Sequence, residues 1–350
     1  MTGIGHGSSR RPQYLPALDG LRGLAAMWVF VFHVIHNGSD DWTPGYLGVD
    51  LFFILSGFVL SHVYSGRLEN AGDYGRFLLA RLARIYPLHL ATLLATGVVV
   101  ALLPGFAESY PRADARFGTE AFLACLLLIQ NWWYFLPGCW NAPAWSLSAE
   151  WAGYLLFPAF LFLAARVKWP LVMAFAGMAA LEILLLAKGA SPGATGLPGM
   201  GRMVFGAVTG CLTHRAWLAG ARLPVMPATI AALLLLGIAH VPGLGAVGAL
   251  GFPAFVLMAA REEGPIAQIC GARPAVWLGE ISYSIYLWHW LVLQIAQRLP
   301  EAEARGPIWY GALFAAVLLL SWASYHWIER PARRWVLRIP AIVRERAPAV

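Results

Sequence analysis

The chain has 350 residues, of which 59% are hydrophobic and only 12% charged, and its mean hydropathy is +0.63. A soluble domain carries about 25% charged residues, so this composition excludes an ordinary soluble protein and indicates an all-α, polytopic membrane protein. The formal net charge is +7. Anionic membrane lipid accounts for this charge, and no nucleic-acid-binding motif is present.

Apolar runs long enough to suggest membrane segments recur along the whole chain. There are eleven, at 18–36, 46–64, 85–104, 121–136, 150–165, 169–187, 202–218, 226–242, 246–260, 276–297 and 307–328. Most basic residues lie between these runs or in the tail, and the positive-inside rule places such segments in the cytoplasm.

The basic residues also limit how many runs cross the membrane. Arg84 and Arg166 are both expected inside, which requires an even number of crossings between them, yet three runs lie there. The segment 121–149 contains NWWYFLPGCWNAPAW and is predicted to be re-entrant or interfacial. The sequence therefore predicts ten spanning helices in a single domain 1–350, with cytoplasmic tails at 1–17 and 330–350 and with both termini inside.

The first run, LDGLRGLAAMWVFVFHVIH, contains three ionisable residues: Asp19, Arg22 and His33. Each costs roughly 2.5 kcal/mol or more inside a bilayer, so a function is expected for them. Arg22 and His33 are about 16 Å apart along a helix and only about 20° apart around it. Asp19 lies within about 40° of His33. All three are therefore expected near one face.

Asp50 is the expected partner of His33. In an antiparallel hairpin of the first two helices the two side chains have a similar depth. A carboxylate beside an imidazole orients it and raises its basicity, as in a general-base pair. A purely structural contact between the two helices is the alternative.

Arg81 and Arg84 are expected at the cytoplasmic start of the third spanning helix, with Arg76 before them. Several guanidinium groups there are suited to bind a polyanion through bidentate hydrogen bonds. Anchoring by the positive-inside rule explains the same residues, and charge alone favours it.

Two further stretches carry polar residues into apolar segments. NAPAWSLSAEW contains Ser148 and Glu150, and LGEISYSIYLWHW places Ser282, Tyr286 and His289 along one face of a helix. Cys125, Cys139, Cys211 and Cys270 show no metal-ligand spacing, so no metal site is expected and the thiols are interpreted as small buried groups.

The chain resembles the bacterial acyltransferase family 3, integral membrane enzymes that O-acylate carbohydrates and related acceptors. Six stretches carry the resemblance, in the family's order and over nearly the whole chain. They are LPALDGLRGLAAMWVFVFHV, YLGVDLFFILSGFVLS, RLARIYPLH, WSLSAEWAGYLLFP, LGEISYSIYLWHW and SYHWIERPARR.

The resemblance implies an O-acetyltransferase of the bacterial inner membrane. It implies a cytosolic acyl-CoA donor, normally acetyl-CoA, with no tightly bound cofactor, and a hydroxyl acceptor such as a polysaccharide or its lipid-linked precursor. Arg22 and His33 match the family's essential residues, and Arg81 and Arg84 match its donor-side pair. Asp50, Glu150 and His289 match recurring positions. The esterase-like domain of some members is not present, so a separate extracytoplasmic partner is an alternative route for the acceptor.

Several alternatives stay open at this stage. His33 is expected either to deprotonate the acceptor or to carry the acyl group briefly, and Arg22 to stabilise charge on the donor or the oxyanion. A secondary metabolite such as a macrolide is the second acceptor class. A multi-pass carrier or flippase would also keep His, Asp and Arg inside the membrane. Oligomeric state is not predicted.

Overall fold

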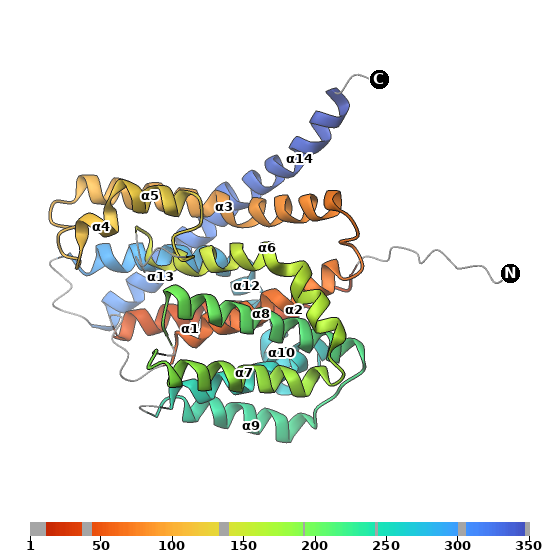
Figure 1. The fold of residues 1–350 in the computed structure, drawn as a ribbon. Helices are drawn as coiled ribbons and strands as arrows, with labels where there is room; N and C mark the ends of the chain where they lie inside the picture. The colour runs from red at the N-terminus through yellow and green to blue at the C-terminus, as the bar shows by residue number, and fades with distance from the viewer. Residues whose placement is uncertain are drawn as a thin grey trace.

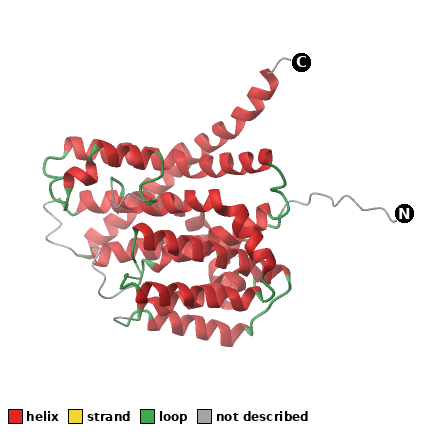
Figure 2. Cartoon of the chain, viewed as in Figure 1, coloured by secondary structure: helices red, strands yellow, loops and turns green. Residues whose placement is uncertain are grey.

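The computed structural model describes residues 12–36, 44–132, 140–191, 193–241, 244–299 and 306–346. These residues form a bundle of helices joined by loops, and they contain no strand (Figures 1 and 2). The all-α architecture expected from composition is confirmed.

The described elements follow one another as helices of very different length. In chain order they are α1 (Pro16–His36), α2 (Leu47–Tyr64), α3 (Ala71–Leu102), α4 (Ala113–Phe117), α5 (Thr119–Leu126), the short 3-10 turn η1 (Ala142–Ala144), α6 (Trp145–Arg166), α7 (Pro170–Ala187), α8 (Gly196–Leu218), α9 (Val225–Ile238), the 3-10 turn η2 (Gly245–Gly251), α10 (Phe252–Arg261), α11 (Gly264–Gly271), α12 (Arg273–Ala296), α13 (Pro307–Ser324), the π-helical turn η4 (Tyr325–Glu329) and α14 (Arg330–Arg346).

Six helices in the described residues are long and apolar enough to cross a membrane, or seven if the bent pair formed by η2–α10 and α11 counts as one span. The chain is therefore a multi-pass membrane protein. The ten spans expected from the sequence are not confirmed. α5 and α9 are too short at about 1.5 Å per residue, and α8 and α12 lie outside the six although they are long enough, because polar residues interrupt them.

The predicted re-entrant segment 121–149 begins with a short helix and continues as irregular chain. α5 ends at Leu126, and a turn follows in which Leu128 has a positive φ of 57°. Residues 133–139, which include Cys139, lie outside the described residues. The next helix, α6, begins at Trp145, five residues earlier than the apolar run indicates. Residues 121–132 form no spanning helix, whereas residues 142–149 belong to the candidate span Ala142–Arg166, so the predicted segment ends inside a spanning helix. The depth of the rest of the segment in a bilayer stays a prediction.

Glycine allows two helix pairs to pack with their backbones in contact. A Cβ atom added to Gly279 of α12 would overlap the Asp19 carbonyl group of α1, and one added to Gly23 would meet the Gly279 backbone. α2 and α8 meet in the same way, since a Cβ atom on Gly57 would overlap the Ala207 backbone. These close approaches are typical of helix packing in membranes, and they hold α1 against α12 and α2 against α8.

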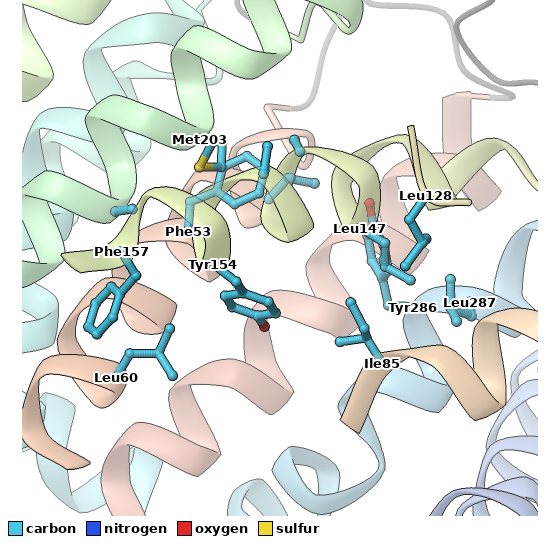
Figure 3. Packing of buried hydrophobic residues seen from close by; sticks show 14 of the residues in the cluster. Phe53, Leu60, Ile85, Leu128, Leu147, Tyr154, Phe157, Met203, Tyr286 and Leu287 are labelled. Atoms are coloured by element: carbon cyan, nitrogen blue, oxygen red, sulfur yellow. The ribbon is translucent and has the colours of Figure 1, made fainter. Parts of the chain in front are cut away.

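Buried aromatic and aliphatic side chains from α2, α3, α6, α8 and α12 fill the middle of the bundle (Figure 3). Phe53, Phe157 and Met203 belong to this cluster, as does Tyr286. By contrast, long apolar side chains of α7 and α9, such as Ile183 and Leu234, are exposed. Exposed apolar faces of this kind are expected to contact lipid. The described cysteines, Cys125, Cys211 and Cys270, are buried, as predicted.

Candidate active site

A large cavity of about 910 Å³ opens among α1, α2, α3, α6, α12 and α14; we call it the arginine cavity. Six arginines and four acidic residues line it. They are Arg22, Arg81, Arg84, Arg330, Arg333 and Arg334, with Asp19, Glu150, Glu280 and Glu329. Ser282 and Tyr286 also line it. Seven of the eleven residues that the sequence singles out thus share one cavity, although only three of the lining arginines were among them.

Arg81 and Arg84 lie well inside α3 and not at its start. α3 begins at Ala71, where the side chain of the N-cap residue Asn70 accepts a hydrogen bond of 3.0 Å from the Asp73 amide. The helix is therefore longer than the predicted run 85–104, and it carries both arginines into the wall of the cavity.

Three of the cavity's arginines have partners in its wall. Arg22 donates a 2.7 Å hydrogen bond to the Asp19 carboxylate one turn earlier in α1. Arg84 forms an ion pair with Glu329, a carboxylate that is almost fully buried. Arg81 donates to the Tyr64 hydroxyl at 3.3 Å and lies over its ring.

The inner end of the arginine cavity is lined by hydroxyls. The Ser56 hydroxyl donates a 2.9 Å hydrogen bond to Glu150, and the Ser282 hydroxyl bonds the Gly279 carbonyl of its own helix at 2.7 Å. The Tyr286 and Ser146 hydroxyls are 2.7 Å apart. Glu150, Ser282 and Tyr286 are therefore placed together, as one site, by α6 and α12.

A second cavity, of about 360 Å³, contains the two histidines; we call it the histidine cavity. Part of its wall is aromatic, with Phe32, Tyr46, Trp145 and Trp290, and Arg116 and Arg202 also line it. His33 and His289 line it together. Aromatic faces of this kind give a carbohydrate ring an apolar surface against which to pack.

The two histidine rings lie 5.0 Å apart between their centroids. The Nδ1 of His33 is 2.8 Å from the Val29 carbonyl oxygen, and the Nδ1 of His289 is 3.2 Å from that of Ile285. A carbonyl only accepts, so each Nδ1 carries the hydrogen and each Nε2 is left with a lone pair. Both rings can therefore accept a proton at Nε2.

The predicted pairing of His33 with Asp50 is wrong. Both Asp50 carboxylate oxygens accept hydrogen bonds from Arg202 of α8, each at 2.8 Å, and the pair is buried. Arg202 also donates to the carbonyl oxygens of Ala194 and Tyr46. The Asp50 carboxylate is held by Arg202 of α8, so it does not orient the imidazole.

Ser148 is also placed differently from the expectation. It is fully buried and lines neither cavity. Its hydroxyl oxygen accepts a 3.1 Å hydrogen bond from the Asn131 amide, and its carbonyl accepts one of 2.9 Å from the Trp132 indole. Ser148 therefore ties the irregular segment before α6 to that helix.

The two cavities meet in the middle of the bundle. Val49 and Tyr286 line both of them. The arginine cavity takes the first turns of α1, around Arg22, and the histidine cavity takes the stretch around His33, about 16 Å further along the same helix. Val49 and Tyr286 therefore form the boundary between the two cavities.

Sequence reasoning missed several of the residues that build this site. Arg202 is one, although a lone arginine inside an apolar run is a signal in itself. Glu329 and the three arginines after it are the others, because the basic composition of the tail was explained by orientation alone. No group of three or more His, Cys, Asp or Glu side chains in the described part of the chain is placed to hold a metal ion.

The order of these elements matches a known family over most of the chain. The family model described as an acyltransferase domain matches residues 15–326, which include α1 through the first residues of η4. The chain belongs to acyltransferase family 3. The resemblance recognised from the six sequence motifs is confirmed. The family match contains the lining of both cavities except for Tyr14, Glu329 and the four lining residues of α14, which are Arg330, Arg333, Arg334 and Leu337.

Two relatives in acyltransferase family 3 show how much of a named member the chain covers. The chain is 28% identical to the peptidoglycan O-acetyltransferase OatA of Listeria monocytogenes over 367 residues, which is 92% of this chain and 56% of OatA. It is 31% identical to the acyltransferase MdmB of Streptomyces mycarofaciens over 333 residues, 83% of this chain and 81% of MdmB. The chain thus spans about half the length of its peptidoglycan-modifying relative. No solved structure matches it.

Proposed function

We propose that this protein is a membrane O-acyltransferase that moves an acyl group, normally acetyl, from acyl-CoA to a hydroxyl of a carbohydrate acceptor. One observation carries the proposal: two cavities with different linings, one with six arginines and one holding two histidines, share Val49 and Tyr286 in their walls. Such an arrangement suits two substrates that enter separately and react where the cavities meet.

The arginine cavity is the proposed donor site. Acyl-CoA carries phosphates at one end and a thioester at the other, and guanidinium groups bind phosphate through bidentate hydrogen bonds. With both termini and α14 on the cytoplasmic side of the inner membrane, as the basic segments favour, this cavity opens toward the cytosolic donor. Arg22 then acts on the donor and not on the oxyanion, because about 16 Å of α1 separates it from His33.

The histidine cavity is the proposed acceptor site. His33 Nε2 takes the proton of the acceptor hydroxyl, whose oxygen attacks the thioester carbonyl. The carbon–sulfur bond then breaks, and the leaving thiolate takes the proton from His33, so that free CoA and an ester are produced. The Tyr286 hydroxyl, at the boundary of the cavities, is the proposed hydrogen-bond donor to the carbonyl oxygen as that oxygen gains negative charge.

The acceptor class is supported by the aromatic wall of the histidine cavity and by the name of the OatA relative. We therefore propose a polysaccharide of the cell envelope, or its lipid-linked precursor, as the first acceptor to test. A macrolide, the second acceptor class expected from the sequence, is the second to test. The chain also spans most of the acyltransferase MdmB, whose name specifies no acceptor.

The deciding experiment measures thiol release from acetyl-CoA by the purified full chain in nanodiscs, with and without an extract of envelope glycans or a macrolide. Acceptor-dependent release is expected from the wild type and at least a 100-fold lower rate from His33→Ala, in keeping with loss of a general base. His240→Ala is the matched control, because His240 makes the same bond to the carbonyl four residues earlier but lines neither cavity.

The outcomes separate the competing functions. If the His33→Ala protein turns over at the wild-type rate, His33 is not the base. If the wild type neither binds nor consumes acetyl-CoA with any acceptor, acyl transfer is wrong and the carrier or flippase function is favoured instead. Transport of a labelled glycan into proteoliposomes then becomes the measurement to make.

A further inference from the structure

One face of the C-terminal helix α14 lines the arginine cavity. Arg330, Arg333, Arg334 and Leu337 are all in its wall, and their spacing of three, four and seven residues places them on one side of a helix. Figure 1 shows α14 leaving the bundle beside α3. This segment had been interpreted from sequence only as a basic cytoplasmic tail.

Buried contacts at its first turn hold α14 in this position. The π-helical turn η4 ends at Glu329, which is almost fully buried, forms the ion pair with Arg84 of α3, and accepts a 3.3 Å hydrogen bond from the Ser284 hydroxyl of α12. Arg330 then lies over the Tyr325 ring, 5.6 Å from its centroid. α14 also packs directly against α3. π-Helical turns are frequent at functional sites.

The charges around the cavity are not balanced within the wall. Arg84 has Glu329 and Arg22 has Asp19, but no carboxylate in the described residues forms an ion pair with Arg333 or Arg334. Arg333 is close enough to Arg81 and Arg84 for their positive charges to repel one another. Like charges held around one cavity are costly unless an anion lies between them.

We propose that α14 is the phosphate-binding element of the donor site, with Arg333 and Arg334 binding the nucleotide phosphates of acyl-CoA beside Arg81. This proposal rests on the proposed function and adds residues to it. Arg333 and Arg334 are exposed, whereas Glu150 and Tyr286 lie deeper, so the nucleotide end sits at the mouth of the cavity and the thioester points inward. Arg84 is then a positioning residue, because its charge is already neutralised by Glu329 and this ion pair fixes the start of α14.

The test compares the double variant Arg333→Gln, Arg334→Gln with the wild type, both as full chains in nanodiscs of neutral phosphatidylcholine. Binding of CoA, dephospho-CoA and pantetheine is measured by calorimetry. Each lost charged hydrogen bond is expected to weaken CoA binding by about 10-fold or more, with pantetheine binding unchanged. In turnover, the apparent KM for acetyl-CoA should rise while kcat stays close to that of the wild type.

Arg338→Gln is the matched control, since Arg338 lies one turn beyond Arg334 on α14, carries the same charge and does not line the cavity. It should bind CoA like the wild type. Repeating the measurement with phosphatidylglycerol in the nanodisc separates a nucleotide site from a lipid-headgroup site. A lipid site would show CoA affinity that falls steeply as anionic lipid is added and that does not distinguish CoA from dephospho-CoA.

Three results would overturn the inference. One is unchanged CoA binding by the double variant when the wild type binds. Another is an equal loss in Arg338→Gln, which would assign the effect to general surface charge. The third is the lipid pattern just described. All three leave the acyltransferase function intact, whereas a wild type that binds no CoA in any lipid rejects the function together with the inference.

Discussion

The imidazole rings of His33 and His289 face one cavity from two different helices, 5.0 Å apart between centroids. Each ring donates a hydrogen bond from Nδ1 to a backbone carbonyl of its own helix. The Nε2 of His289 is buried with no hydrogen-bond partner among the described residues. A buried nitrogen without a partner is rare unless a ligand or water completes it. The pair therefore offers an acceptor hydroxyl two nitrogens that can take a hydrogen bond.

The first prediction concerns His289. We expect His289→Leu, which keeps much of the volume, to lower kcat for acyl transfer by about 10-fold or more while the Kd for CoA stays unchanged, since one acceptor contact in the histidine cavity is lost. Steady-state turnover and CoA calorimetry on the same preparation check this. A variant with full turnover would make His289 a packing residue only.

The second prediction concerns Asp50 and Arg202. Asp50→Ala leaves a buried guanidinium without its carboxylate, so we expect the protein to lose about 3–5 kcal/mol of stability. The double variant Asp50→Leu, Arg202→Met removes both charges and should recover most of that loss. Thermal unfolding in detergent measures the stability of both variants against the wild type.

The same double variant tests whether Asp50 takes part in catalysis. Because its carboxylate is committed to Arg202, we expect acyl transfer to recover along with stability. Stability that returns without activity would restore a catalytic role to Asp50.

The third prediction concerns the junction at Tyr286. Tyr286→Trp adds bulk where the two cavities meet, and we expect acyl transfer to fall by about 100-fold or more with CoA binding unchanged, because the reacting groups no longer approach. Tyr286→Phe retains the ring and removes the hydroxyl that bonds Ser146. A 100-fold loss in Tyr286→Phe as well would assign the effect to the hydroxyl, as expected of an oxyanion donor.

The fourth prediction concerns the contact between α1 and α12. Gly279→Val would force the Asp19 backbone away, so we expect the stability to fall by about 1–3 kcal/mol and acyl transfer to be lost as His33 and His289 separate. Gly311→Val on α13 is the control, because nothing lies within 4 Å of a Cβ atom there. Equal unfolding temperatures for the two variants would contradict this account of the packing.

The sequence alone predicted many of the residues that line the site, but not which side chains form ion pairs or hydrogen bonds with one another. Helical geometry along one element is reliable, which explains why Arg22, Glu150, Ser282 and Tyr286 do share a cavity. The same geometry does not give the direction of the Asp50 side chain relative to another helix. That direction depends on α8 and Arg202, which no local pattern relates to α2.

The ten spanning helices expected from the apolar runs are not confirmed, for a related reason. Apolar runs report burial, and they do not distinguish a helix that crosses the bilayer from a short or bent one packed inside the bundle. The irregular chain before α6 was identified from its Trp, Pro and Gly content. The role of α14 was not, because a cluster of arginines after the last apolar run is typical of every inner-membrane protein.

The backbone contact between α1 and α12 has a consequence for how the protein is made. α1 leaves the ribosome long before α12, so Asp19, Arg22 and His33 enter the bilayer before the helix that covers them exists. Contacts between such distant parts of a chain form late and slowly. A nascent chain that stops before Arg273 would therefore leave a polar first helix uncovered in the membrane, a state suited to recognition by quality-control proteases.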